Sequence, residues 1–117
     1  MIGWQRTMNT YEIYISSIIW GGNKKRRPVL MIEGYLNEIT CFRITTHHQS
    51  NIEGKLIKYF VINDWQQAGL NEQSYIDTSF TVTMPKTAID DTPIGKLSVE
   101  DEIRLIEFID RGTGDVR

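Results

Sequence analysis

Cysteine is nearly absent from this chain of 117 residues, which contains Cys41 alone. A single cysteine excludes an internal disulfide, and its position within an apolar run predicts a small buried side chain. No apolar run approaches the ~18 residues of a membrane-spanning helix, and Met1–Thr7 contains no apolar stretch of signal-peptide length. These absences predict a soluble protein of the reducing cytoplasm that has no membrane partner.

Positive charge is not in excess either, because the formal net charge at pH 7 is -2. This balance argues against a protein that binds nucleic acid by bulk electrostatics. The charge is nevertheless segregated, since Lys24–Arg27 forms a basic block and acidic residues concentrate in Glu100–Asp110. Such a basic block on an acidic protein can hold a few phosphates, weakly and with a small salt dependence.

The length and the 40% of hydrophobic residues predict a single domain over residues 1–117 with a core of its own. The sequence contains no internal repeat, low-complexity segment or linker. We interpret residues 1–10 as a flexible or peripheral N-terminal extension and residues 11–111 as the folded body. Met8 directly precedes the first strand-like segment, so the start of translation is open between Met1 and Met8.

Alternating and β-branched residues predict several short strands. The expected strands are Tyr11–Trp20, Val29–Glu33, Ile39–Thr46, Leu56–Ile62 and Gln73–Met84. Gly21–Asn23 is a turn signal, because these residues tolerate positive φ, and Lys24–Arg27 is expected on the connecting loop. Asn63 and Asp64 are expected to cap one helical turn that Gly69 ends.

Only the C-terminal segment predicts a long helix. Ser98 would cap it, the Asp101 side chain would reach back to the cap, and Gly112 would terminate it. Apolar residues recur along this segment at helical spacing. The stripe expected to pack on the sheet is Val99, Ile103, Ile106 and Ile109. Short strands followed by one helix predict a mainly β (α+β) fold, a small bent sheet or barrel with a packed helix.

Several stretches resemble motifs of the MazF/PemK (Kid) family of toxins, in the family's order. Arg26–Ile32 (RRPVLMI) is similar to the family strand RRPVLVI, and Ile44–Thr46 is similar to the strand end ITT or ITS. The other similar stretches are Glu12–Tyr14, Ala68–Leu70, Ser74–Asp77 and Ile94–Ser98, followed by Ile103 and Ile106. The resemblance runs from about residue 11 to residue 111.

The resemblance implies a small SH3-like barrel of the MazF/PemK/CcdB type that forms a homodimer. Family members cleave single-stranded RNA without metal or other cofactor, and a cognate antitoxin protein blocks them. Carried over by residue, Arg27 falls on the catalytic arginine of the family and Thr45 on its hydroxyl partner. Thr46 and Asp77 fall on positions that help to shape the site in some members.

The chain departs from the family pattern at two places. Tyr11 stands where the family has a glycine before its first strand, and the connection Trp20–Arg27 is shorter than the family loop that covers RNA. These departures leave open a degenerate relative that acts as an interaction module. A second alternative on the same fold is a non-catalytic binder like the CcdB gyrase inhibitors, which need no arginine–threonine pair.

Cleavage of RNA without metal uses the 2'-OH of the substrate as nucleophile, so the protein must stabilise charge on phosphorus and move protons. Arg27 suits charge stabilisation, because a guanidinium presents a rigid fork of donors and remains protonated. Thr45 would donate a hydrogen bond to a non-bridging oxygen. His47 and His48 follow directly and are candidates for proton transfer, with solvated loop histidines as the alternative.

Cations and aromatic rings near the basic block are the expected RNA contacts, since cations attract phosphate and rings stack on unpaired bases. This set is Lys24, Lys25, Arg26, Trp20 and Tyr35, with Tyr59 as a further aromatic. For each aromatic ring, the alternative to stacking on a base is burial in the core. Two adjacent histidines without a third ligand do not fit a zinc site, so no metal is expected. The prediction is a toxin-type endoribonuclease of single-stranded RNA.

Overall fold

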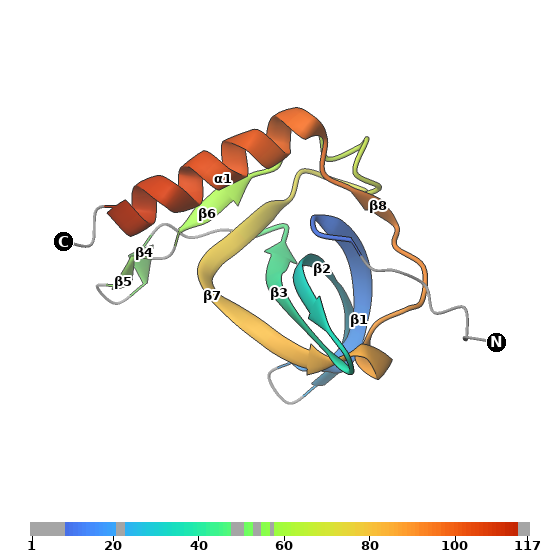
Figure 1. Cartoon of the computed structure of the whole chain (residues 1–117). Helices are drawn as coiled ribbons and strands as arrows, with labels where there is room; N and C mark the ends of the chain where they lie inside the picture. The colour runs from blue at the N-terminus through green and yellow to red at the C-terminus, as the bar shows by residue number, and fades with distance from the viewer. Residues whose placement is uncertain (1–8, 21–22, 48–50, 53–54, 57, 115–117) are drawn as a thin grey trace.

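The computed structural model describes residues 9–20, 23–47, 51–52, 55–56 and 58–114. They form a strongly bent antiparallel sheet with one helix along its side (Figure 1). The sheet contains β1 (Glu12–Trp20), β2 (Asn23–Tyr35), β3 (Glu38–Thr45), β6 (Tyr59–Val61), β7 (Tyr75–Pro85) and β8 (Gly95–Lys96). The other elements are β4 (Asn51–Ile52), β5 (Lys55–Leu56), the 3-10 turn η1 (Lys86–Ala88) and α1 (Val99–Gly114). The expected mainly β fold with one C-terminal helix is confirmed.

The six strands of the sheet lie in the order β6-β7-β3-β2-β1-β8, and β4 pairs with β5 apart from them. Three of the five expected strands match β1, β3 and β7 within two residues at each end. The strand expected over Leu56–Ile62 is wrong as one unit, because β5 and β6 belong to different sheets. The apolar run alone could not show that its two halves find different partners.

The sheet bends most sharply where β7 leaves its register with β3. Cys41 pairs with Val82 and Arg43 pairs with Asp77, so a single β3 residue faces the four β7 residues 78–81. Extra residues in one strand of a pair bend that strand and increase its twist. Figure 1 shows the resulting corner in β7, which turns the sheet toward a barrel.

Side chains that alternate along the strands fill two apolar clusters on opposite faces of the sheet. In β2, Leu30 belongs to the cluster that also contains Leu105 of α1, whereas Val29 and Met31 belong to the other. Cys41 lies in the second cluster, as expected, and its Sγ is 3.5 Å from the Val82 carbonyl oxygen. Burial raises the pKa of this thiol to about 11, which keeps it protonated and unreactive.

Two glycines hold the segment before α1 against the turn after β6. Residues 63–69 contain the expected helical turn, in which the Ala68 N–H donates to the Asp64 carbonyl at 3.1 Å and Gly69 ends the turn at φ 90°. A Cβ on Gly95 would lie 2.2 Å from the Ala68 carbonyl oxygen, and one on Gly69 would lie 2.2 Å from the Ile94 carbonyl oxygen. Only glycine permits this approach of two backbones.

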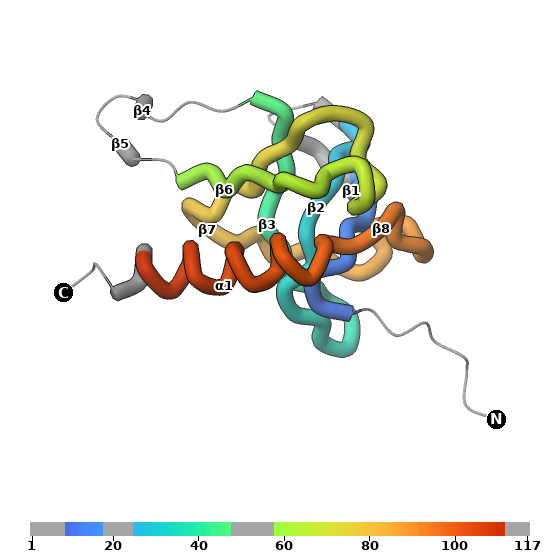
Figure 2. Tube along the Cα trace, turned by 90° about the horizontal axis from the view of Figure 1, so that it is seen from above, coloured from blue at the N-terminus to red at the C-terminus, as the bar shows by residue number. Residues whose placement is uncertain are grey.

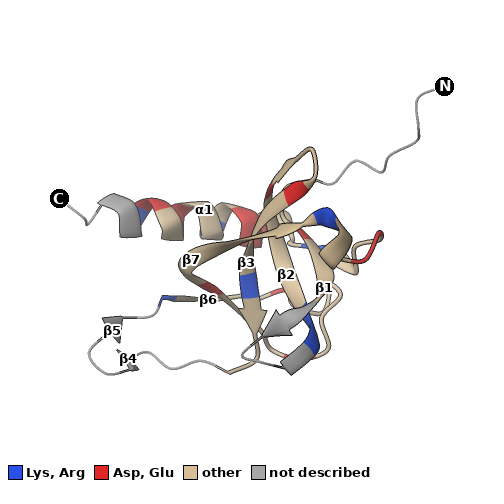
Figure 3. Cartoon of the chain, turned by 90° about the horizontal axis from the view of Figure 1, so that it is seen from below, with Lys and Arg blue, Asp and Glu red and all other residues tan. Residues whose placement is uncertain are grey.

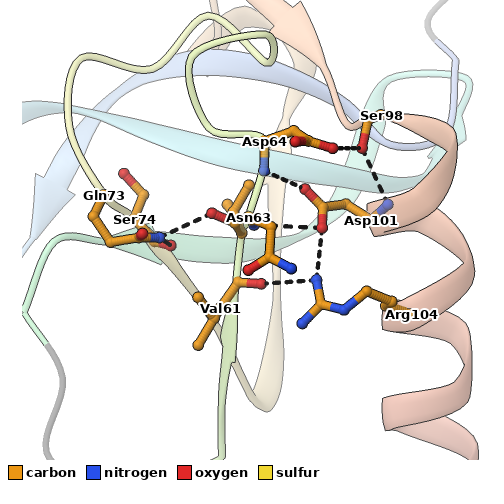
Figure 4. A network of polar contacts seen from close by, with 9 residues as sticks. Val61, Asn63, Asp64, Gln73, Ser74, Ser98, Asp101 and Arg104 are labelled. Carbon is orange, nitrogen blue, oxygen red and sulfur yellow. Dashed lines mark hydrogen bonds and ion pairs between the residues drawn. The ribbon is translucent and has the colours of Figure 1, made fainter.

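Helix α1 is attached to the body through its first turn (Figure 4). Ser98 caps it as expected, since its Oγ accepts from the Asp101 N–H at 3.1 Å. The expectation for the Asp101 carboxylate is wrong, because it accepts instead from the N–H groups of Asn63 at 3.3 Å and Asp64 at 2.8 Å. The Asp64 carboxylate in turn accepts from the Ser98 hydroxyl at 2.6 Å. The cap of the helix is therefore also its tie to the β6 turn.

The middle of α1 lies beside the outer edge of β6, as Figures 1 and 2 both show. Arg104 Nη1 donates to Asp101 Oδ1 at 2.6 Å and to the Val61 carbonyl oxygen at 3.3 Å. Its guanidinium also lies 4.7 Å from the centre of the Phe60 ring. One arginine thus satisfies a carbonyl on the sheet edge and a buried carboxylate, which keeps this edge from pairing with another strand.

The expected packing stripe of α1 is wrong for Val99, Ile103 and Ile106, and only its fourth member, Ile109, packs on the core. Leu105 is fully buried and Phe108 and Ile109 are partly buried, whereas Val99, Ile103 and Ile106 are 65%, 53% and 44% exposed. The helix also continues past Gly112 to Gly114. Helical spacing identifies apolar stripes but not which one faces the sheet, and here buried Asp101 belongs to the packed face.

Candidate functional site

The basic block lies in a strand, which corrects the expectation of a loop. β1 ends at Trp20 and β2 begins at Asn23, and the ladder between them runs through the pairs Ile19–Lys24, Ser17–Arg26 and Ser16–Arg27. A strand alternates its side chains, so Lys25 and Arg27 point to one face and Arg26 to the other. The glycines before the basic block and its charges predicted a loop, but β1 and β2 stay paired up to Trp20 and Asn23.

The first half of β2 leaves one edge open near the end of β3. Within the described residues, β3 pairs with β2 only from Val29, which lies opposite Arg43. Continuing this register by two residues puts Arg27 opposite Thr45, across a gap where the two strands separate. A cavity of about 270 Å³ fills this gap. Its lining residues are Lys25, Arg26, Arg27, Pro28, Ile44, Thr45, Thr46 and Ser74.

Arg27 lines this cavity and carries an unsatisfied buried donor. Its Nε is buried and has no hydrogen-bond partner within the described part of the chain. Its carbonyl is held, because it accepts from the buried Ser16 hydroxyl at 3.1 Å. Leaving a buried N–H unsatisfied costs about 1–3 kcal/mol, which an acceptor that came within hydrogen-bond distance of Nε would regain.

Thr45 ends β3 with a local turn. Its hydroxyl accepts from the His47 N–H and lies 3.1 Å from the His47 carbonyl oxygen, to which it can donate. Thr46 Oγ1 lies 3.2 Å from His47 Nδ1. The structure therefore brings Arg27, Thr45 and Thr46 to one cavity, and the exposed His47, which is not among the lining residues, contacts Thr45 and Thr46.

Arg26 is engaged elsewhere. Its guanidinium donates to the Ser17 hydroxyl at 2.7 Å and to the Asp90 carboxylate at 2.5 Å. The Arg26 and Asp90 side chains are 58% and 44% exposed, so solvent screens this pair and a competing phosphate can displace it. Lys25 is exposed and lines the cavity.

Asp77 and Tyr35 lie away from the cavity lining. Asp77 is buried in β7, opposite Arg43, and its Oδ1 accepts from the Ser79 N–H at 2.9 Å. Tyr35 is 73% exposed at the far end of β2, about 26 Å from Arg27 along an extended strand at ~3.3 Å per residue. The structure does not bring Tyr35 together with Arg27.

For three predicted site residues, the structure describes only the backbone or nothing at all. His48 lies outside the described residues, and Trp20 and Lys24 are described only as backbone of β1 and β2. Tyr59 is described, in β6 opposite Asp77.

Two serines of the site were missed by sequence reasoning. Ser16 is fully buried under the Arg27 carbonyl, and Ser74 is buried and lines the cavity. A hydroxyl inside an otherwise apolar strand was a signal for Ser16. Ser74, which precedes β7, has no separate signal beyond its place in a stretch that resembles a family motif.

The described residues contain no group of three side chains that could bind a metal ion. Nor does any helix among them combine the length and apolar character needed to cross a membrane.

Comparison with known proteins identifies the fold. No protein-family model and no curated protein sequence matches the chain. Among solved structures, the chain is similar to the Mycobacterium tuberculosis toxin MazF-mt6, with a TM-score of 0.64 and 24% sequence identity. The match covers 88% of this chain and 96% of that chain. The chain therefore has a MazF-like toxin fold, as the resemblance of its motifs implied.

Proposed function

We propose that the protein is a metal-independent endoribonuclease that cleaves single-stranded RNA in the manner of MazF toxins. The observation that carries this proposal is that Arg27, whose Nε has no hydrogen-bond partner in the described part of the chain, lines one cavity with Thr45 and Thr46. A phosphodiester supplies the acceptor oxygens that these donors lack. A guanidinium and a hydroxyl side by side bind such a group with complementary charge and geometry.

In the proposed reaction the 2'-oxygen of one nucleotide attacks its own 3'-phosphorus. The P–O5' bond breaks, giving a 2',3'-cyclic phosphate and a 5'-hydroxyl. Arg27 donates to the non-bridging oxygen on which charge develops, and the Thr45 hydroxyl turns from the His47 carbonyl to the same phosphate. Preorganised donors of this kind each contribute about 3 kcal/mol to transition-state stabilisation.

Two protons move in this reaction, one from the 2'-OH and one to the leaving O5'. We propose His47, which contacts the cavity residues Thr45 and Thr46, as the side chain that transfers these protons. Its Nδ1 lies 3.2 Å from the Thr46 hydroxyl, which would orient the ring and leave Nε2 free to face the substrate. Lys25 and Arg26, with Lys24, would attract the flanking phosphates.

The proposal extends to the partners of the protein. We propose a homodimer in the cytoplasm that a cognate antitoxin holds inactive, and the MazF-like fold supports this part of the proposal. An acidic antitoxin segment would occupy the cavity of Arg27 in place of the phosphate, because carboxylates satisfy the same donors.

The test is cleavage of a long single-stranded RNA in excess EDTA. Wild type is expected to give discrete fragments with 5'-hydroxyl ends, and Arg27→Met to lose about 10²–10³-fold in rate. Arg27→Lys keeps the charge but not the planar fork and is expected to recover only part of the rate. Arg111→Met is the matched control, because Arg111 is exposed on α1 away from the cavity.

Stability measurements separate chemistry from folding in this experiment. Arg27→Met removes an unsatisfied buried donor, so the free energy of unfolding is expected to stay within about 1 kcal/mol of wild type. Intact RNA after incubation with folded wild type would contradict the nuclease. Binding of a protein such as gyrase would then be the function to test on this fold.

A further inference from the structure

The outward face of α1 carries a row of exposed apolar side chains, which we call the outer stripe. Val99, Ile103 and Ile106 are 65%, 53% and 44% exposed and follow one another at helical spacing. Single apolar residues on a surface need no explanation, but three aligned branched side chains on one helix face form a contiguous patch of the kind that marks interaction sites.

The outer stripe cannot turn inward, because the opposite face of α1 is fixed. Asp101 is 1% exposed and bonded to the backbone of the β6 turn, and Leu105 is fully buried in the core. Phe108 packs edge-on against Phe60 at 5.5 Å between ring centres. The stripe is therefore held rigidly toward solvent, so α1 itself loses no ordering free energy when a partner docks there.

The border of the outer stripe is acidic. At 100° per residue, Asp110 lies in line with the stripe, and Glu100 and Glu107 lie along one side of it. All three are exposed, and Arg111 is the one exposed cation in the described part of α1. Figure 3 shows that acidic residues recur along the helix. A complementary partner therefore carries cations beside an apolar seam.

This charge pattern disfavours a second copy of the chain as the occupant. An antiparallel pair of α1 helices centred near Ile103 would set Glu100 of one copy against Glu107 of the other. A parallel pair would oppose each glutamate with itself. Like charges across a helix pair are destabilising, and no exposed lysine on α1 offsets them.

We propose that the outer stripe of α1 is a docking site for an amphipathic helix of another protein, whose apolar seam is flanked by lysine or arginine. The seam would pack on Val99, Ile103 and Ile106, and the cations would pair with Glu100 and Glu107. This mode is helix-on-helix recognition, with apolar anchors spaced by one helical turn. The docking site is independent of the proposed nuclease, because no residue that lines the cavity of Arg27 belongs to α1.

A pair of designed peptides tests the docking site. One labelled peptide of about three heptads has leucine at the a and d positions and lysine at e and g; the other has glutamate in place of each lysine. Fluorescence anisotropy is expected to show binding of the lysine peptide to the full-length protein. Ile103→Gln/Ile106→Gln should weaken it by at least about tenfold, although the charge of the protein is unchanged.

Two further variants sharpen the result. Glu100→Gln/Glu107→Gln is expected to reduce the preference for the lysine peptide over the glutamate peptide. Phe80→Gln, which removes a 57% exposed ring from β7, is the matched control and should bind like wild type. Circular dichroism verifies that each variant is folded.

The proposal is overturned if the lysine peptide does not bind, or if the two peptides bind equally well. Undiminished binding by the folded Ile103→Gln/Ile106→Gln variant would also overturn it, because the attraction would then be charge alone. If sedimentation shows that this variant turns a wild-type dimer into a monomer, the occupant is a second copy and the proposed partner is wrong. None of these outcomes depends on RNA cleavage.

Discussion

Neighbouring arginines in β2 have different roles at the scale of single residues. Arg26 is satisfied by Ser17 and Asp90, whereas Arg27 keeps a buried Nε without a partner in the described part of the chain. An unsatisfied donor destabilises the free protein and favours the bound state. The resemblance to MazF toxins identified Arg27 as a candidate, but only the structure shows that its Nε–H donates no hydrogen bond to the described residues.

Tyr11 is a second residue whose backbone does not suit its side chain. Its φ of 71° lies in the left-handed region, at the position where MazF-family sequences have glycine. The conformation is imposed from both sides, because its N–H donates to the Met31 carbonyl at 2.7 Å and its carbonyl accepts from the Leu97 N–H at 3.1 Å. The partly buried ring packs against the core and offsets the strain.

A pair of variants at Tyr11 measures this strain. Tyr11→Gly and Tyr11→Ala both remove the ring, but only glycine adopts positive φ without a steric cost. Both should be less stable than wild type, and the glycine variant should exceed the alanine variant by about 1 kcal/mol in free energy of unfolding. Urea titration followed by circular dichroism measures the difference. Alanine equal to or above glycine would mean that the backbone is not strained.

Titration of Tyr11 lies outside the neutral range. Burial, with a smaller contribution from the charge of Glu102, raises the pKa of its phenol above the ordinary value of 10.0. A raised folded-state pKa adds stability that is present below the unfolded pKa and lost only as alkaline pH passes the folded pKa. Tyr11 therefore contributes no pH dependence near neutrality.

At the scale of elements, the sequence indicated most strands but not their contacts. Alternation predicted β1, β3 and β7, because a half-buried strand repeats every two residues. It could not predict that β2 begins at Asn23, since glycines and a run of cations are also typical of loops. Nor could it predict which stripe of α1 is buried, because the packed face hides the charged residue Asp101 among apolar ones.

The candidate site was predictable only where it repeats a family motif. Arg27 and Thr45 were assigned from resemblance, and the structure places both in one cavity. The Arg26–Asp90 pair was not predictable, because these residues lie far apart in sequence and their contact depends on the bend of the sheet. Tyr35 was expected near the site but lies at the other end of β2, and the strand expected over Val29–Glu33 already separated it from Arg27.

The close approach of the backbone at Gly95 to the turn that ends at Gly69 predicts that an added methyl group destabilises the fold. Gly95→Ala puts a Cβ 2.2 Å from the Ala68 carbonyl oxygen, so one backbone must shift. We expect a loss of about 3 kcal/mol or more in free energy of unfolding. Gly34→Ala is the matched control, because its Cβ would meet only the end of the flexible Met31 side chain, at 3.4 Å. Equal stabilities of the two variants would contradict the close approach.

At the scale of the whole molecule, one buried carboxylate joins the helix to the sheet. Asp101 receives N–H groups from the β6 turn and the guanidinium of Arg104, which itself binds the edge of β6. The same tie fixes the outward direction of the outer stripe. Docking on α1 and the integrity of the sheet edge therefore depend on one residue.

Asp101→Asn tests this dependence. The new amide turns a donor toward the N–H of Asp64 or the guanidinium of Arg104, so at least one buried donor loses its acceptor. We expect a loss of about 3 kcal/mol in free energy of unfolding, measured by urea denaturation. Asp110→Asn, the same change at an exposed site on the same helix, should cost less than about 0.5 kcal/mol.

Hydrogen exchange locates the effect of Asp101→Asn within the molecule. Because the carboxylate ties α1 to the β6 turn, the amides of α1 and of residues 63–69 should lose protection together. Amides of the β1–β2 ladder, which Asp101 does not touch, should change only as far as global stability requires. Loss of protection spread evenly over all strands would instead mean that Asp101 stabilises the fold as a whole and does not act as the local tie of the helix.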